Sequence, residues 1–235
     1  MTRSEDGLDE LTRASGLDLA EYRTAHVEER VRRACDVERV DGTRALARLL
    51  RTDDGARARF RRAVAVSHTG FFRDAEQFAL IERELLPRLA GRARRLRCWS
   101  AGCADGSELY SLAVVLQRAS LLESSFLLGS DLLEENVSAA RRGHALPEIT
   151  PGMRARVRFE RRDLLRDGAP AGRFSLVICR NVAIYLAPAA KRRLHFLLAG
   201  SLAPGGALVV GRSERIGYAA TLGLAQAGPH VYVRR

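Results

Sequence analysis

Apolar and polar residues along the chain follow two different patterns, and the change between them falls near Gln77. Up to about Val66, apolar residues recur at helical intervals, as at Val27 and Val31, and no proline interrupts them after Leu8. Beyond Gln77, short apolar runs alternate with helical patterns. We therefore expect an N-terminal all-helical domain over residues 1–66, a linker over 67–76 and a second domain over 77–235.

Turn and capping residues divide the helical region. Asp9 and Asp41 are predicted to cap helices, and Gly42 and Gly55 are predicted to break the pattern into short helices.

The second region predicts an α/β fold. Strands are expected at 96–101, 126–131, 157–160, 174–179, 207–210 and 230–233, with helices at 109–117, 134–142 and 188–198. Strand–helix alternation at this spacing predicts a mostly parallel sheet that is covered by helices on both faces. A hairpin around Gly228 and Pro229 would add an antiparallel edge.

The composition and the distribution of apolar residues indicate where in the cell the protein is expected. A hydrophobic content of 46% supplies an ordinary globular core. No apolar run approaches the ~20 residues that span a bilayer. The first residues are polar and acidic, unlike a secretory signal. We expect a cytoplasmic protein.

Cysteines and charge bear on cofactors and partners. The four cysteines are scattered, with no Cys-x-x-Cys pair, so we expect reduced structural thiols and no metal site. The formal charge of +11 suits binding to nucleic acid or to an acidic protein surface. Charge alone leaves both kinds of partner open.

Glycines and acids follow three predicted strands. Gly102 and Gly106 follow the first, Asp131 ends the second, and Asp163 with Leu164 follows the third. Singly, these residues could form a tight turn, cap the next helix or sit in a loop. No Gly-x-Gly-x-x-Gly is present after the first strand, which disfavours a dinucleotide. Together they resemble the cofactor site of the class I (Rossmann-like) S-adenosylmethionine-dependent methyltransferases.

Four further segments narrow the resemblance. They are Ser-His-Thr-Gly-Phe-Phe-Arg-Asp at 67–74, Trp-Ser-Ala-Gly-Cys-Ala-Asp-Gly-Ser-Glu at 99–108, Cys-Arg-Asn-Val-Ala-Ile-Tyr at 179–185 and Gly-Arg-Ser-Glu at 211–214. In this order they resemble the CheR-type chemoreceptor methyltransferases, which methyl-esterify glutamate side chains. The resemblance covers the chain from about Leu17.

The resemblance implies roles for individual residues. S-adenosyl-L-methionine would be the cofactor and S-adenosyl-L-homocysteine the product, and the linker would contribute to the active site. Arg73 and Tyr185 would face the methyl-accepting glutamate as catalytic residues, whereas Phe71 and Phe72 are expected to pack. The cofactor would be bound by Ser67, Thr69, Gly102, Gly106, Glu108, Asp131, Asp163, Leu164, Arg180 and Asn181.

The chemistry suits a carboxylate acceptor. A glutamate with a pKa of about 4.3 is ionised at neutral pH and needs no general base. What remains is to orient it, for which a guanidinium and a phenol hydroxyl are suited.

The sequence also departs from the family. Ser67 replaces the usual asparagine, Ser107 replaces a glutamate and Leu109 a proline. Only residues 144–156 stand where classical members carry a small antiparallel β-subdomain, which in some members docks a receptor's carboxyl-terminal pentapeptide. This stretch is too short for three ordinary strands, so no pentapeptide tether is expected.

The expected partner is a chemoreceptor or another acidic helical protein, with membrane association only through that substrate. Arg30 and Arg33 share a helical face and resemble the family's receptor-docking arginines. The alternative is a solvated face paired with Glu28, Glu29 and Asp36. Two other functions stay open, an RNA methyltransferase and a non-catalytic cofactor-sensing adaptor. Because the Asn/Asp-Pro-Pro-Tyr/Phe segment of amino-methylating nucleic-acid enzymes is absent after the fourth strand, no nucleic acid is expected.

Overall fold

The computed structural model describes residues 2–66, 69–93, 95–143 and 148–235, with backbone only for residues 2–6. The chain divides into two compact units. One consists of Met1–Ser67 with Tyr185–Lys191, and the other of His68–Ile184 with Arg192–Arg235.

The N-terminal unit is helical. It contains α1 (Thr2–Ser15), η1 (Leu19–Glu21), α2 (Thr24–Glu38), α3 (Gly42–Thr52) and α4 (Asp54–Ala65). Their apolar faces meet in a core that includes Leu11, Leu46, Leu50 and Phe60, each at most 2% exposed. The helical periodicity read from the sequence reflects this shared core.

Two of the predicted helix boundaries in this unit are wrong. Asp9 lies inside α1, and Gly55 lies inside α4 and does not break it. The break falls two residues earlier, where the Asp53 carboxylate accepts the Ala56 N–H at 2.9 Å and caps α4. Asp41 does precede α3, but its side chain makes no capping hydrogen bond.

The second unit holds the sheet. Its strands are β1 (Arg97–Ala101), β2 (Phe126–Asp131), β3 (Val157–Arg161), β4 (Phe174–Cys179), β5 (Leu202–Val210), β6 (Leu224–Gly228) and β7 (Val231–Arg234). Its other elements are α5 (Ala75–Leu80), η2 (Ile81–Leu85), α6 (Leu86–Ala90), α7 (Ser107–Arg118), α8 (Glu134–Arg142), α9 (Pro151–Arg156) and η4 (Ala219–Leu222). Two elements, η3 (Ala183–Tyr185) and α10 (Pro188–Ser201), have residues in both units.

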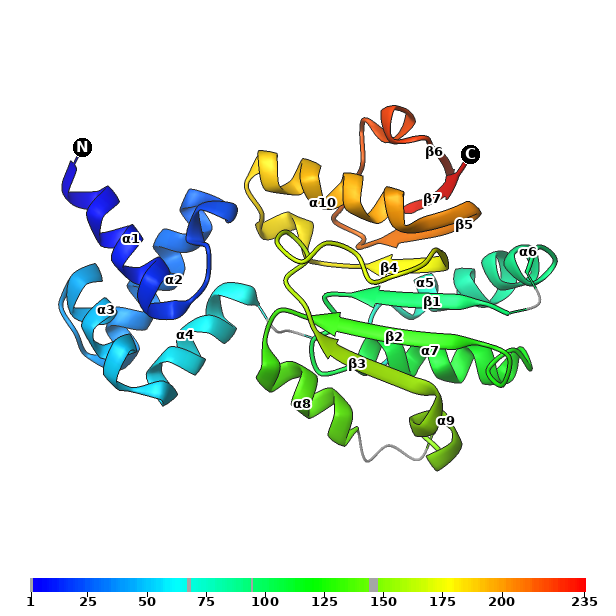
Figure 1. Ribbon diagram of the computed structural model, residues 1–235, viewed down its shortest axis with the longest axis horizontal. Coiled ribbons are helices and arrows are strands. Elements are labelled where there is room, and N and C mark those ends of the chain that lie inside the picture. The colour runs from blue at the N-terminus through cyan, green and yellow to red at the C-terminus, as the bar shows by residue number, and fades with distance from the viewer. Residues whose placement is uncertain (1, 67–68, 94, 144–147) are drawn as a thin grey trace. The chain divides into compact units, whose positions relative to one another are not determined.

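The sheet has the order β3-β2-β1-β4-β5-β7-β6 (Figure 1). The pairs β1–β2, β1–β4, β2–β3 and β4–β5 are parallel, and β7 pairs antiparallel with β5 and β6. The predicted α/β fold with a mostly parallel sheet is confirmed, as is the C-terminal hairpin. Strand β5 starts earlier than the sequence predicts, because residues 202–206 continue the strand into the Pro-Gly-Gly segment.

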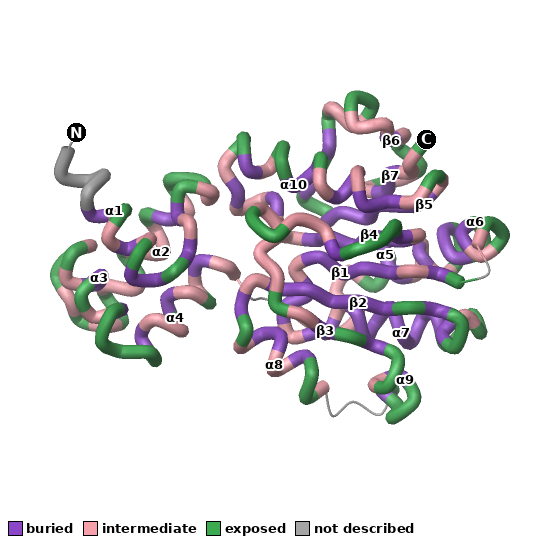
Figure 2. The backbone as a smooth tube through the Cα atoms, viewed as in Figure 1, coloured by how far each residue is buried: buried purple, intermediate pink, exposed green. Residues whose placement is uncertain are grey.

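The strands direct alternate side chains to opposite faces of the sheet. Cys98, Leu176 and Ile178 point into a core that also contains residues of α5, α6, α7 and α8. Figure 1 shows α10 in front of the sheet and α7 behind it. This arrangement follows from right-handed crossovers, since β1→β2 and β4→β5 advance in opposite directions along the sheet. Figure 2 shows the central strands almost wholly buried.

Two connections depart from the strand–helix alternation. Residues 162–173 join β3 to β4 without a helix. Between α8 and β3, the described residues 143 and 148–156 hold α9 and no strand. None of the described helices is long and apolar enough to cross a membrane.

Candidate active site

The glycine loop after β1 lies at the carboxyl edge of the sheet, where parallel α/β folds bind ligands. The Gly102 N–H donates to the Ser130 carbonyl at 2.8 Å, which ties the loop to the end of β2. Gly102 has a φ of +80°, and a Cβ there would lie 2.6 Å from Val182 Cγ2. This glycine therefore serves a turn and a close approach between the loops after β1 and β4.

Asp131 lies at the end of β2 and is 8% exposed. One carboxylate oxygen accepts the Ala104 N–H at 2.9 Å, and the other accepts the Leu133 N–H and the Asn136 amide. Burial raises the pKa of Asp131, and these hydrogen bonds oppose the shift. The carboxylate thus organises the β1 loop and the start of α8, beside its predicted role in cofactor binding.

Glu108 begins α7 directly after the glycine loop, and 12% of its side chain is exposed. It accepts a hydrogen bond from the Ser100 hydroxyl at 2.7 Å and forms an ion pair with Arg180 at 3.3 Å. Burial raises the pKa of Glu108, while Arg180 lowers it. A buried carboxylate of this kind gains from a cationic ligand group such as an ammonium.

Arg180 follows β4 and joins the linker to the sheet. Its side chain is 4% exposed. It donates to the Gln77 amide oxygen at 2.7 Å, to the Arg73 carbonyl at 2.7 Å and to the Asp74 carboxylate. Together with the ion pair to Glu108, these bonds give each of the three guanidinium nitrogens a partner within the protein. Arg180 therefore fixes the backbone of the Phe-Phe-Arg segment, and a direct cofactor contact stays a prediction.

The loop after β4 is held by a residue that the sequence analysis did not select. Asn181 has a φ of 60°, in the left-handed region. The Glu214 carboxylate, 1% exposed, accepts the N–H groups of Asn181 at 2.9 Å, Ala183 at 2.9 Å and Gly211 at 2.7 Å. Three backbone donors to one buried carboxylate fix this conformation. Glu214 is the last residue of the Gly-Arg-Ser-Glu segment at 211–214. The resemblance of this segment to the family is the feature of the sequence that could have pointed to Glu214.

Asp163 and Leu164 lie at the start of the β3–β4 connection. Asp163 accepts the N–H groups of Leu165 and Arg166 at 3.0 and 3.3 Å, as a turn aspartate does. Both side chains are half-buried. Their contact with the cofactor stays a prediction.

The linker is tightly turned around Arg73. Phe72 and Asp74 have φ angles of 51° and 57°, and the Phe72 N–H donates to the Ser111 hydroxyl at 2.8 Å. Phe71 and Phe72 pack edge to face against each other and onto the core, which confirms their predicted packing role. Thr69 is half-buried, and Ser67 lies outside the described residues.

Tyr185 belongs to the N-terminal unit, whereas Arg73 belongs to the other. The Tyr185 ring lies 5.0 Å from that of His26, and its carbonyl accepts the Arg23 N–H at 2.9 Å. The pairing of Tyr185 with Arg73 around a substrate stays a prediction.

The basic face of α2 is partly paired. Arg33 forms an ion pair with Glu29 at 2.5 Å, and Arg32 pairs with Glu29 at 2.7 Å and with Asp36 at 3.4 Å. All these side chains are at least 38% exposed, so the pairs are weak and exchangeable. These pairs support the alternative of a solvated, internally paired face. Because the arginines remain exposed, they can still contact an acidic partner.

The four cysteines are free, as expected, and Cys98, Cys103 and Cys179 are buried. Burial raises the pKa of Cys98 to about 12, which keeps it a thiol. Among the described residues, no group of three or more His, Cys, Asp or Glu could hold a metal ion.

The mostly parallel sheet and the acidic residues at its carboxyl edge are compatible with an S-adenosylmethionine-binding methyltransferase domain, and a family model assigns this class. The family model described as "CheR methyltransferase, SAM binding domain" matches residues 67–150 and 143–227. The chain therefore belongs to the CheR methyltransferase family, and its cofactor is S-adenosyl-L-methionine.

Relatives support the assignment over most of the chain. A chemotaxis protein methyltransferase of Listeria monocytogenes is 31% identical over 93% of this chain and 92% of its own length. Chemotaxis protein methyltransferase 1 of Pseudomonas aeruginosa is 28% identical over 88% of this chain and 87% of its own. A TehB-like SAM-dependent methyltransferase structure from Corynebacterium glutamicum aligns with a TM-score of 0.42 at 18% identity, over 68% of this chain and 95% of that one.

The residues present fit this cofactor. Glu108 and Asp131 are acceptor-only carboxylates in sites that water hardly reaches, and the cofactor offers an ammonium and ribose hydroxyls as donors. Asp131 lies on the strand end that the Gly102 turn ties to the β1 loop, and Glu108 lies in the first turn of the helix that follows this loop.

Proposed function

We propose that this methyltransferase esterifies glutamate side chains on chemoreceptor-like proteins. The observation that carries the proposal is the Arg180 network, which anchors the Arg73 and Asp74 segment beside Glu108. The backbone of Arg73 is thereby held by the same arginine that pairs with Glu108, a predicted cofactor ligand. A guanidinium carried by that backbone suits an anionic acceptor.

The proposed chemistry needs orientation and no general base. The cofactor supplies a methyl group activated by its sulfonium. With the cofactor bound, one oxygen of the substrate carboxylate would take up this methyl group and S-adenosyl-L-homocysteine would leave, so that the other product would be a methyl ester. The carboxylate is ionised beforehand, and no proton moves. Arg73 holds the second oxygen, and Tyr185 orients the group through its hydroxyl.

The substrate side of the proposal rests on charge and on relatives. The formal charge of +11 favours an acidic partner. The Listeria and Pseudomonas relatives carry chemotaxis methyltransferase names. We place the docking of the acidic helices at Arg30 and Arg33, without a pentapeptide tether, and the enzyme in the cytoplasm, where receptor signalling helices lie.

The experiment is mass-spectrometric mapping of the methylated position. The purified protein is incubated with S-adenosyl-L-methionine and the signalling domain of a receptor from its own host. The proposal expects one added methyl group on glutamates of exposed helices. Methylation of lysine, of RNA added in parallel, or of no acceptor despite bound cofactor would contradict it.

A further inference from the structure

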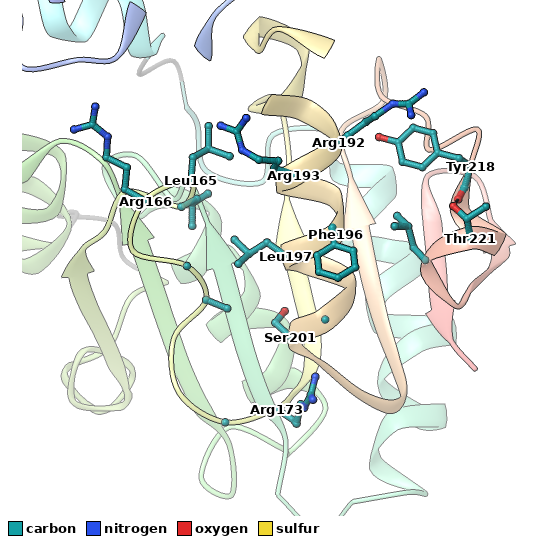
Figure 3. Close-up of a pocket in the computed structure, with 16 residues that line it drawn as sticks. Leu165, Arg166, Arg173, Arg192, Arg193, Phe196, Leu197, Ser201, Tyr218 and Thr221 are labelled. Carbon is teal, nitrogen blue, oxygen red and sulfur yellow. Dashed lines mark hydrogen bonds between the residues drawn. The ribbon is translucent and has the colours of Figure 1, made fainter. Parts of the chain in front are cut away.

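A groove runs along the sheet face that carries α10, between α10, the β3–β4 connection and η4 (Figure 3). Its volume is about 840 Å³. All of its lining residues belong to the second unit. The groove therefore needs nothing from the N-terminal helices.

The groove presents apolar surface to solvent. Phe196 projects from α10 with 72% of its surface exposed, and Leu165, Leu197 and Leu222 lie around it. Burying an apolar side chain of this size is favourable because its hydrophobic surface is removed from water. Such exposure beside other apolar residues marks a surface that gains from a partner.

Arginines surround this apolar surface. Figure 3 shows Arg166, Arg192 and Arg193 at one end of the groove and Arg173 at the other. No acidic side chain is among the described residues that line it. The Arg192 guanidinium lies 5.3 Å from the centre of the Tyr218 ring. Arg166 forms an ion pair at 3.9 Å with Asp163, which does not line the groove. The rim is thus cationic, and an anionic partner complements it.

The shape of the groove follows from the missing crossover helix. A parallel crossover normally covers the sheet with a helix, but residues 162–173 cross from β3 to β4 without one. On the opposite wall, Arg193, Phe196, Leu197 and Gly200 follow the i, i+3, i+4, i+7 row of α10. A Cβ at Gly200 would meet nothing within 4 Å. A second helix can therefore lie against α10 in ridge-and-groove contact.

We propose that this groove binds an acidic amphipathic helix of a partner protein. The apolar face of that helix would cover Phe196 and the leucines, and its carboxylates would meet Arg173 at one end and Arg192 at the other. This is the helix-in-groove mode of recognition. A second copy of this chain is a poorer occupant, because each copy carries a formal charge of +11. The proposal does not depend on which group the enzyme methylates.

The test uses the full chain and two synthetic 18-residue helical peptides, one with a leucine face and a glutamate face, the other with lysine for every glutamate. Fluorescence anisotropy measures their binding. The acidic peptide is expected to bind at least tenfold more tightly than the basic one. Hydrogen exchange should slow on its addition in residues 164–173, 192–201 and 218–222, which contain the lining residues, and nowhere else in the second unit.

Three variants localise the site. Arg173→Glu with Arg192→Glu should weaken binding of the acidic peptide at least tenfold by charge. Gly200→Leu should weaken it similarly by filling the groove without changing charge. The matched control is Arg83→Glu with Arg88→Glu, which makes the same charge change at two exposed arginines of η2 and α6 and should leave binding within twofold.

Equal weakening by the control pair, or no effect of Gly200→Leu, would overturn the proposal in favour of unspecific charge attraction. Self-association of the chain in sedimentation, abolished by Phe196→Ser, would overturn it in favour of a second copy. Circular dichroism checks that each variant is folded.

Discussion

Glu108 and Asp131 show how burial adjusts single residues at this site. Each carboxylate has most of its surface covered by the protein, and burial raises the pKa of both. Burial disfavours the ionised form of each carboxylate, but hydrogen-bond donors hold that form in a fixed orientation. A ligand that brings further donors compensates this cost, which links cofactor binding to the ionisation of these groups.

Glu108→Gln removes that ionisation. We expect S-adenosyl-L-homocysteine to bind about tenfold more weakly, a loss of ~1.4 kcal/mol. In the wild type, affinity should fall as the pH drops through the raised pKa of Glu108, whereas the variant should lose this part of the pH dependence. Calorimetric titrations between about pH 4.5 and 7 measure both.

The same shift sets the sign of a stability effect. Because the folded pKa of Glu108 is raised, the native state binds more protons than the unfolded state above the ordinary pKa. Its contribution to the free energy of unfolding therefore decreases as the pH rises, and levels off above the folded pKa. A ligand-free urea series in which wild type and Glu108→Gln show equal slopes with pH would contradict this account.

The sequence predicts Glu108 and Arg180 as site residues because each directly follows a strand or its turn and lies in a family-like segment. It predicts Asp131 because this residue ends a strand. It did not identify Gln77 or Glu214. Gln77 bonds to Arg180, 103 residues away, and Glu214 bonds to Asn181, 33 residues away. Such partners are set by how the strand ends meet, and periodicity carries no information about them. The Asp163 turn contacts likewise depend on the helix-free path of its connection.

At the scale of elements, the loops after β1 and β4 support each other. Gly102→Ala places a Cβ 2.6 Å from Val182 Cγ2 and also strains a φ of +80°. We expect cofactor affinity to fall at least tenfold. The double variant with Val182→Ala removes the collision and keeps the strain, which is of order 1–2 kcal/mol, so it should regain part of the affinity. No gain in the double variant would show that the contact is irrelevant.

The Glu214 carboxylate fixes the β4 loop in the same way. Glu214→Gln replaces one acceptor oxygen by an NH₂ group that faces backbone donors, which should cost about 1.5–3 kcal/mol of folding free energy. We expect a Tm lower by several degrees and weaker cofactor binding.

Alanine substitutions at two glycines distinguish a specific effect on the β4 loop from a general loss of stability. A Cβ at Gly211 would lie 2.7 Å from Glu214 Oε2, whereas one at Gly217 would meet nothing within 4 Å. Gly211→Ala should therefore reproduce the loss of cofactor binding, and Gly217→Ala should not. Equal binding by Gly211→Ala and wild type would remove the positioning role of Glu214.

The element pattern itself was well predicted where packing is periodic. Helix α8 and strands β2 and β4 lie where the sequence places them, because each buries a regular apolar set. The predicted cap at Asp9 and the predicted break at Gly55 were wrong, since single polar or glycine residues are tolerated inside helices when tertiary packing supports the whole segment.

At the scale of the whole molecule, charge is expected to bring the substrate to the enzyme. Arg30→Glu with Arg33→Glu should reduce methylation of a receptor fragment several-fold at low salt and leave S-adenosyl-L-homocysteine affinity unchanged. Arg32→Glu with Arg39→Glu is a control with the same charge change on α2 and its cap. Methylation that responds equally to both pairs, or to neither, would remove the assigned docking role of Arg30 and Arg33.

The most direct test of the account measures the bond that the enzyme makes. Tritiated S-adenosyl-L-methionine is supplied with receptor-containing membranes of the host that lack endogenous activity, and alkali then releases volatile methanol from carboxyl methyl esters. We predict volatile counts with the wild type and at least a hundredfold fewer with Arg73→Ala. Counts that resist alkali, or volatile counts that Arg73→Ala leaves unchanged, would contradict glutamate esterification at this site.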